Sequence, residues 1–127
     1  MIRVVAAALY DRDGRVLIAQ RPPGKHMAGR WEFPGGKIDD GESEQAALSR
    51  ELSEELGITV GLAHPLLTIR HDYVDRSVEL VMWIVEDYVG EPRSLDGQQL
   101  KWVPPARLLE EDVPEADRPF IEALQRR

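Results

Sequence analysis

Three glutamates in one short stretch have the type and spacing that catalysis could use. On a helix, which turns by about 100° per residue, Glu51, Glu54 and Glu55 fall within one arc of about 100°, and Ala47 adds little bulk there. Carboxylates at these spacings repel one another, and a helix C-terminus disfavours negative charge. Clustered carboxylates suit Mg²⁺ or Mn²⁺, which in turn bind phosphates. A solvated acidic face, eased by Arg50, is the alternative that this pattern leaves open.

The element that must carry these glutamates is a helix predicted over residues 43–56. Ser43, or the acidic turn before it, can cap the first turn, and Gly57 is a typical terminator. Three leucines lie within about 80° of the helix circumference and are predicted to be buried: Leu48, Leu52 and Leu56. The helix therefore packs through its leucines and presents the glutamates beside the packed face.

Most of the remaining chain alternates between strand patterns and turn signals. Residues 2–9 and 16–20 are apolar runs joined by Asp11-Arg12-Asp13-Gly14, and we predict that they pair as a hairpin. Residues 21–30 hold two prolines and two glycines and are predicted to form a loop. Further strands are predicted at 31–33, stopped by Pro34-Gly35-Gly36, at 66–74 and 77–89 around a turn at Asp75-Arg76, and at 99–103.

Two helical segments are predicted after the last strand. Pro104 and Pro105 open a short helical turn at residues 106–109, and a final helix covers residues 116–125. The inner face of this helix is predicted to consist of Phe120, Ile121 and Leu124. Strands with helices on either side predict a mixed α/β or α+β sandwich in a single domain over residues 1–127.

The composition excludes several classes of protein. The 127 residues include no cysteine, which rules out a disulfide scaffold, a cysteine nucleophile and a thiolate zinc site and suits a cytoplasmic protein. The formal net charge of −7 disfavours binding to long polynucleotides. No apolar run reaches the roughly 18 residues of a membrane span. We therefore expect a small phosphate-bearing substrate, and neither a polynucleotide nor a membrane as partner.

The stretch GGKIDDGESEQAALSRELSEELGI combines Gly36, Glu42 after five further residues, Arg50-Glu51 after seven more, and Glu54-Glu55 ahead of Gly57. This pattern resembles the Nudix box in full, and the box is very specific. The resemblance implies an α/β/α sandwich with a mixed β-sheet. It also implies that helix glutamates bind divalent metal and that water attacks a phosphorus atom of the substrate.

The same resemblance implies roles for individual residues of the box. Glu51, Glu54 and Glu55 are expected to be metal ligands, one of which also positions or deprotonates the water. Arg50 is expected to orient a glutamate. Gly36 is expected to lend its backbone to the metal shell or to allow close approach of a phosphate. The implied cofactor is Mg²⁺, for which Mn²⁺ can substitute.

The sequence on both sides of the box resembles the MutT-type enzymes of this family, which hydrolyse oxidised guanine nucleotides to monophosphate and pyrophosphate. The segments GRWEFPGGK, DGQQLKWVP and VPEADRPFIEAL carry this resemblance. It implies that Arg21, helped by Lys37, reaches the phosphates or the sugar, although Arg21 could also be an ordinary solvated strand end. Glu32 is expected in the metal or water network. Asp96 is expected as a further metal ligand or base on a loop, one methylene shorter than the usual glutamate.

Four more residues are candidates for contact with the nucleobase. Phe33 and Tyr73 could flank the base or belong to the core, and Arg76 could contact the nucleotide edge or lie in a solvated turn. Asp117 stands where the best-known MutT-type pattern has asparagine, and an ionised aspartate only accepts hydrogen bonds. It could read the base in that form, mimic asparagine if burial keeps it protonated, or simply cap the final helix.

These observations predict a Mg²⁺-dependent nucleoside triphosphate pyrophosphohydrolase that acts on 8-oxo-dGTP, as a monomer or weak homodimer. One alternative is an enzyme that prefers CTP or 5-methyl-dCTP. A second is a non-catalytic nucleotide-binding module, which the complete set of box glutamates disfavours. A third is a hydrolase of RNA ends, which the negative net charge disfavours.

Overall fold

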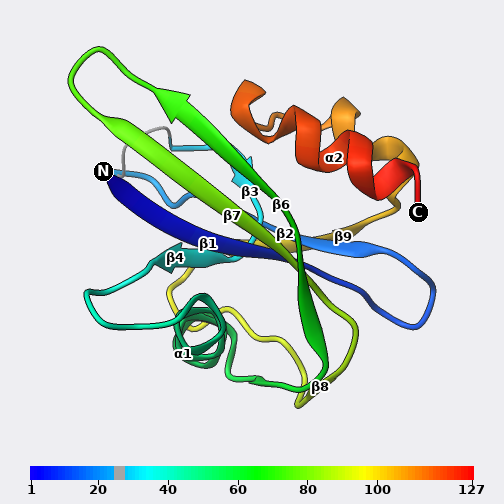
Figure 1. Cartoon of the computed structure of the whole chain (residues 1–127). Helices are drawn as coiled ribbons and strands as arrows, with labels where there is room; N and C mark the ends of the chain where they lie inside the picture. The colour runs from blue at the N-terminus through cyan, green and yellow to red at the C-terminus, as the bar shows by residue number, and fades with distance from the viewer. Residues whose placement is uncertain (25–27) are drawn as a thin grey trace.

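A four-stranded mixed sheet in the order β4-β1-β7-β6 runs through the molecule (Figure 1). The computed structural model describes residues 1–24 and 28–127. In this sheet β1 (Ile2–Leu9) lies parallel to β7 (Ser77–Val85) and antiparallel to β4 (Gly35–Lys37). On its other side, β7 pairs with β6 (Ala63–Asp72) in the antiparallel sense. The mixed sheet predicted for the fold is therefore present.

Two smaller sheets complete the strand structure. An antiparallel sheet in the order β3-β2-β9 consists of β3 (Trp31–Glu32), β2 (Val16–Gln20) and β9 (Gln99–Val103). A two-stranded sheet pairs β5 (Thr59–Val60) with β8 (Tyr88–Val89). The strand predicted at 99–103 and the turn at Asp75-Arg76 are confirmed, since the Tyr73 N–H donates to the Arg76 carbonyl at 2.7 Å.

Helices cover the first sheet from both sides (Figure 1). α1 (Glu44–Leu56) begins after Ser43, whose hydroxyl accepts a hydrogen bond from the Ala46 N–H, and ends at Gly57 in the left-handed conformation. Two 3₁₀ helices, η1 (Pro105–Glu110) and η2 (Glu115–Asp117), lead into α2 (Arg118–Gln125). The final helix thus starts two residues later than predicted, behind η2.

Alternating side chains of the central strands divide the core into two layers. One layer packs Val5, Ala7 and Leu9 of β1 against the leucine stripe of α1: Leu48, Leu52 and Leu56. The other layer packs Ala6 and Ala8 against the inner face of α2: Phe120, Ile121 and Leu124. The predicted α/β/α sandwich and both predicted helix faces are therefore confirmed.

The predicted hairpin between β1 and β2 is wrong. The two strands belong to different sheets, and among the described residues they share only the bridge between Tyr10 and Val16. The turn itself forms, because the Asp11 carboxylate accepts hydrogen bonds from the Asp13 and Arg15 N–H groups. Each strand then finds other partners on both edges, so the chain turns while the strands diverge.

Several shorter predictions also need correction. The strand predicted at 31–33 does stop before Pro34, but β4 was not predicted: Gly35 and Gly36 begin it and pair with β1. The segment predicted at 77–89 divides into β7 and β8, and β5 was not predicted. Part of the predicted loop at 21–30 falls at 25–27, outside the described residues. Within the described part of the chain, no helix is long and apolar enough to cross a membrane.

Candidate active site

α1 directs its glutamates toward the Gly35–Gly36 end of β4, and Glu51, Glu54 and Glu55 together are called the acidic face here. The Gly35 N–H donates to Glu55 Oε2 at 3.1 Å. A Cβ atom on Gly36 would overlap the Glu51 carboxyl group. Both contacts exist because the leucine stripe packs α1 against β1, and β4 is the strand that pairs with β1. Two glycines therefore let two carboxylates reach the backbone, while the Glu54 side chain remains 62% exposed.

Arg50 holds the acidic face from the side. Its Nη1 donates to Glu51 Oε1 at 2.9 Å, and its Nε and Nη2 donate to the Glu42 carboxylate at 2.7 and 2.9 Å. Nη2 also donates to the Lys37 carbonyl at 3.0 Å. These hydrogen bonds from Arg50 lower the pKa of Glu42 to about 2. Arg50 thus lies where the predicted orientation of a glutamate requires it.

Negative charge is crowded at Glu55. Burial, together with the charges of Glu51, Glu32 and Asp96, raises the pKa of Glu55 to about 8, against the lowering effect of the Gly35 N–H. Burial also raises the pKa of Glu51, although hydrogen bonds from Arg50 lower it. A cation placed among these carboxylates would relieve both the desolvation and the repulsion.

The donor set of the acidic face fits a hard divalent cation. Among the described residues, no three acidic or histidine side chains stand close enough together to form a complete metal site as they are arranged. The carboxylates of Glu51 and Glu55 nevertheless both lie against the Gly35–Gly36 segment. Carboxylate and carbonyl oxygens are the donors that Mg²⁺ and Mn²⁺ prefer.

A hollow of about 560 Å³ beside the acidic face joins Glu55 to Glu32, Arg21 and Asp96. Arg21 Nε donates to Glu32 Oε2 at 2.9 Å, so these two predicted site residues form an ion pair. The loop that carries Asp96 docks on α1, because the Leu95 N–H donates to the Glu55 carbonyl at 3.1 Å. The structure therefore brings Asp96 to the acidic face from a segment about 40 residues away, as sequence resemblance led us to expect.

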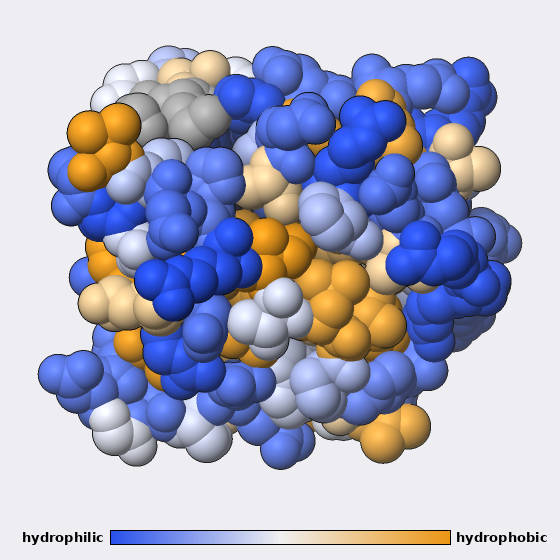
Figure 2. Space-filling model, turned by 45° about the horizontal axis from the view of Figure 1, so that its top comes forward, coloured by the Kyte–Doolittle hydropathy of each residue, from blue (hydrophilic) through white to orange (hydrophobic). Residues whose placement is uncertain are grey.

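A larger cavity of about 850 Å³ adjoins this hollow and shares Arg21 and Glu32 with it. Figure 2 shows an apolar area in the middle of this face with hydrophilic residues around it. The apolar floor of the cavity comes from the strand face that α2 leaves uncovered: Val4, Ala6, Val78, Leu80 and Met82. A cavity with an apolar floor and a few polar groups suits a ring compound, and a phosphate on that compound could bind at the neighbouring acidic face through a divalent cation.

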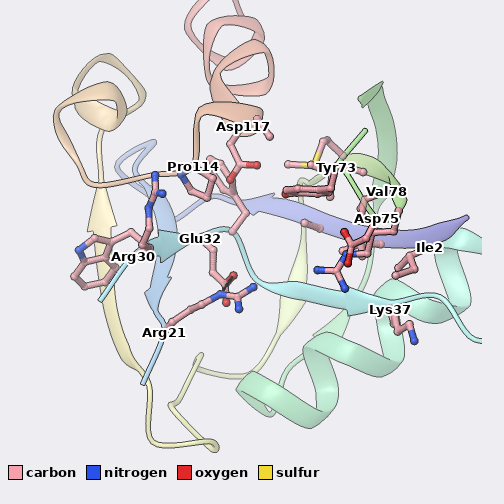
Figure 3. Close-up of a pocket in the computed structure, with 18 residues that line it drawn as sticks. Ile2, Arg21, Arg30, Glu32, Lys37, Tyr73, Asp75, Val78, Pro114 and Asp117 are labelled. Atoms are coloured by element: carbon pink, nitrogen blue, oxygen red, sulfur yellow. Dashed lines mark hydrogen bonds and ion pairs between the residues drawn. The ribbon is translucent and has the colours of Figure 1, made fainter. Parts of the chain in front are cut away.

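Asp117 lies in the wall of this cavity, on the side of α2 (Figure 3). It is the one polar or charged residue among the described residues that is buried, with 8% of its surface exposed. Burial, together with the Glu32 charge, raises the pKa of Asp117 to about 6, against the lowering effect of the Arg30 charge. The capping alternative is wrong, because the Asp117 side chain makes no hydrogen bond to the start of α2. The carboxylate is therefore available to a ligand.

The other predicted base contacts also line the cavity. Phe33 is 5% exposed and packs edge-on against Phe120 at 4.8 Å between ring centroids, so it belongs to the core and to the cavity wall at once. Tyr73 is half exposed, with the Arg76 guanidinium 5.7 Å from its ring centroid. Lys37 lies on the same side of the cavity as Ile2 and Asp75, away from Asp117 (Figure 3).

Sequence reasoning did not single out three features of this cavity. Val4 and Ala6 of the floor could have been found from the alternation along β1, because α2 is too short to cover the whole strand. Asp75 was assigned only to a turn. Arg30 gave no signal, since its partner Val113 lies 83 positions away in the sequence.

Comparisons with known proteins agree with this geometry. The family model of the NUDIX domain matches residues 5–123. The chain is 41% identical to the CTP pyrophosphohydrolase of Escherichia coli strain K12, over 98% of this chain and 91% of that protein. It is 34% identical to the 8-oxo-dGTP diphosphatase of the same strain, over 98% of this chain and 97% of that protein.

Solved structures give the same result. The solution structure of the Escherichia coli ORF135 protein is 40% identical, with a TM-score of 0.88 over 99% of this chain and 89% of that one. The crystal structure of the MutT NUDIX hydrolase from Burkholderia pseudomallei is 31% identical, with a TM-score of 0.84 over 96% of both chains. This chain belongs to the Nudix family and is a MutT-like hydrolase that acts on phosphoric anhydride bonds.

Proposed function

We propose that this Nudix hydrolase cleaves nucleoside triphosphates to monophosphate and pyrophosphate, with 8-oxo-dGTP as its preferred substrate and Mg²⁺ as its metal. The observation that carries the choice of nucleotide is the buried Asp117 carboxylate in the wall of a ring-sized cavity that leads to the acidic face. Mn²⁺ can substitute for Mg²⁺, because both prefer carboxylate oxygens. The reacting phosphates lie at the acidic face and the base lies near Asp117.

The acidic face and its neighbours supply the chemistry. Glu51, Glu54, Glu55 and Asp96 are the residues that would hold the metal, with backbone help from Gly36. A Mg²⁺ ion held there would neutralise phosphate charge, lower the pKa of a water molecule and stabilise the leaving pyrophosphate. One of these carboxylates positions the attacking water or takes its proton. Arg50 keeps Glu51 in place through the 2.9 Å hydrogen bond.

Cationic side chains position the rest of the nucleotide. Arg21 is fixed by Glu32 at the junction of the two hollows, where it can reach the phosphates or the sugar. Lys37 follows Gly36 directly and adds a positive charge on the Ile2 and Asp75 side of the larger cavity. Phe33 and Tyr73 flank the base, and Arg76, stacked on Tyr73, contacts its outer edge.

Oxidised guanine suits a carboxylate in this wall. An ionised Asp117 only accepts hydrogen bonds, and 8-oxoguanine carries an N7–H donor that guanine lacks. An additional donor that meets a buried acceptor gives selectivity, because the unoxidised base would leave that acceptor unpaired. Relatives named 8-oxo-dGTP diphosphatase, at up to 43% identity, support the same substrate.

CTP is a second candidate substrate. The same carboxylate can accept a hydrogen bond from the exocyclic amino group of cytosine. A relative named CTP pyrophosphohydrolase is 41% identical over 98% of this chain. A pyrimidine would fill less of the apolar floor than a purine does.

Pyrophosphate release from a panel of triphosphates with Mg²⁺ tests the proposal. The panel contains 8-oxo-dGTP, dGTP, CTP, 5-methyl-dCTP and dATP. We expect 8-oxo-dGTP to have the highest kcat/KM, at least about tenfold above dGTP. Equal rates for 8-oxo-dGTP and dGTP would refute the sanitising function. A higher kcat/KM for CTP than for 8-oxo-dGTP would establish the second candidate instead.

A further inference from the structure

Arg30 connects two segments that are remote in the sequence and adjacent in the cavity wall. Its Nη2 donates to the Val113 carbonyl at 2.6 Å, and its Nε lies 3.4 Å from Asp112 Oδ1. Beside it, the Trp31 N–H donates to the Asp112 carbonyl at 2.8 Å. The start of β3 is therefore tied to residues 112–113 through one side chain and one backbone contact.

The segment that Arg30 holds leads directly to Asp117. Residues 112–117, here called the base wall, continue from Val113 through Pro114 and Ala116, both of which line the cavity. The Asp117 N–H donates to the Pro114 carbonyl at 3.0 Å, so a shift of Pro114 moves Asp117 with it. Because the Asp117 carboxylate does not cap α2, the helix start does not anchor that side chain. Its position depends on the base wall.

Arg30 also provides the positive charge that faces Asp117. Burial raises the pKa of Asp117 most, the Glu32 carboxylate on β3 raises it further, and the Arg30 guanidinium opposes both. The Arg30 side chain is 30% exposed and its Nε is buried without a hydrogen bond among the described residues. A half-buried cation with an incompletely satisfied donor lowers the stability of the fold. A role for the position of this side chain would account for its presence.

We propose that Arg30 is a positioning residue for nucleobase selection, which holds the base wall so that the Asp117 carboxylate stands at the base subsite. The proposal rests on the proposed function, because it assigns the base to the Asp117 end of the cavity. Arg30 need not touch the phosphates or the metal. Its loss should therefore change which base is preferred and leave recognition of the phosphate end unchanged.

The experiment measures equilibrium binding of products, which requires no turnover. Quenching of tryptophan fluorescence reports binding, since Trp31 lines the cavity. The ligands are 8-oxo-dGMP, dGMP and CMP, with inorganic pyrophosphate and Mg²⁺ as a probe of the phosphate end. The variants are Arg30→Met and Arg30→Lys. The matched control is Arg118→Met, which removes an exposed arginine that neighbours Asp117 in sequence and pairs with Glu122.

We expect Arg30→Met to reduce the ratio of Kd values between the weakest and tightest monophosphate about five- to tenfold, as the loss of one buried hydrogen-bonding arrangement would do. The Kd for pyrophosphate should change less than about twofold. Arg30→Lys should recover part of the ratio of Kd values, because lysine keeps the positive charge. The recovery should be incomplete, because lysine lacks the several N–H donors of the guanidinium group. As the pH is lowered, discrimination between the monophosphates should be lost at a higher pH in Arg30→Met than in wild type. The reason is that Asp117, without its facing cation, takes up its proton at a higher pH.

Three outcomes would overturn the proposal. An unchanged ratio of Kd values in both Arg30 variants would show that the base wall keeps its position without Arg30. An equal weakening of all ligands, pyrophosphate included, would show a general structural role, and Arg30→Lys tests this even if Arg30→Met fails to fold. A loss of discrimination in Arg118→Met as large as in Arg30→Met would show that the loss of any nearby positive charge has this effect. A wild-type protein that binds all three monophosphates equally would refute the base assignment itself, whereas discrimination that survives in the variants refutes only the role of Arg30.

Discussion

The acidic face and the base wall lie at two ends of connected hollows and are built in opposite ways. The acidic face comes from one helix of consecutive residues, closed by the two glycines of β4. The base wall depends on Arg30 and on residues more than 80 positions later in the chain. A site made within one helix leaves a pattern in the sequence, whereas a site made by tertiary contacts does not. In the proposed function, the first end fixes which bond is cut, and the second is free to vary in which base it accepts.

The largest effect is expected from Glu55→Gln, which keeps the shape of the side chain but removes its charge and its capacity to accept a proton. We expect kcat/KM to fall at least about 100-fold for every nucleotide. The matched control is Glu110→Gln, at an exposed glutamate of η1, which should retain wild-type activity. Turnover within a few-fold of wild type in Glu55→Gln would remove Glu55 from the catalytic machinery.

The next largest effect is expected at the two glycines of β4, where alanine should have different consequences. Gly36→Ala places a methyl group on the Glu51 carboxyl, a side chain that can move, so we expect a fold of near-normal stability and a loss of kcat of about 10- to 100-fold. Gly35→Ala instead forces a Cβ onto the Val5 backbone, with φ of 156°, and should lower the thermal stability. Equal effects of both variants on Tm, with activity retained in Gly36→Ala, would contradict this assignment.

A smaller effect is expected from Asp117→Asn at the other end. The substitution adds a donor and removes the charge, so the preference between 8-oxo-dGTP and CTP should change by about tenfold. The absolute kcat on the best substrate should stay within a few-fold of wild type, because the acidic face is intact. Steady-state kinetics on both nucleotides measures the change, and an identical preference in wild type and variant would exclude Asp117 from base recognition.

The smallest effect concerns stability against pH. The pKa of Asp117 is raised to about 6 in the folded protein, above its ordinary value of 3.8. The folded state therefore binds this proton more tightly, and the stabilisation is complete below pH 3.8 and lost as pH rises through about 6. The difference in Tm between Asp117→Asn and wild type should move in favour of Asp117→Asn by about a few degrees between pH 4 and pH 7. A difference in Tm that is the same at both pH values would contradict the raised pKa.

Much of this molecule could be predicted from its sequence where the information is local. The bounds of α1, its cap at Ser43 and its end at Gly57 follow from side-chain chemistry within one helix. The leucine stripe follows from helical periodicity. The acidic face follows from the same periodicity, and the box resemblance supplies its role.

The remaining features depend on long-range pairing. Gly35 and Gly36 are turn formers in local terms, yet strand pairing with β1 makes them part of a sheet. The turn after β1 has hairpin chemistry, but better partners for each strand separate β1 from β2. Arg30 has no local signal, because its contacts form only after the sandwich has closed.

The ratio of kcat/KM for 8-oxo-dGTP to kcat/KM for dGTP, measured in wild type, Glu55→Gln and Asp117→Asn, tests the division of labour between the two ends most directly. Glu55→Gln should lower both rates and leave the ratio within about twofold of wild type, since it removes chemistry common to both nucleotides. Asp117→Asn should change the ratio while the rate on the better nucleotide is largely retained. A changed ratio in Glu55→Gln, or an equal loss on both nucleotides in Asp117→Asn, would contradict the account.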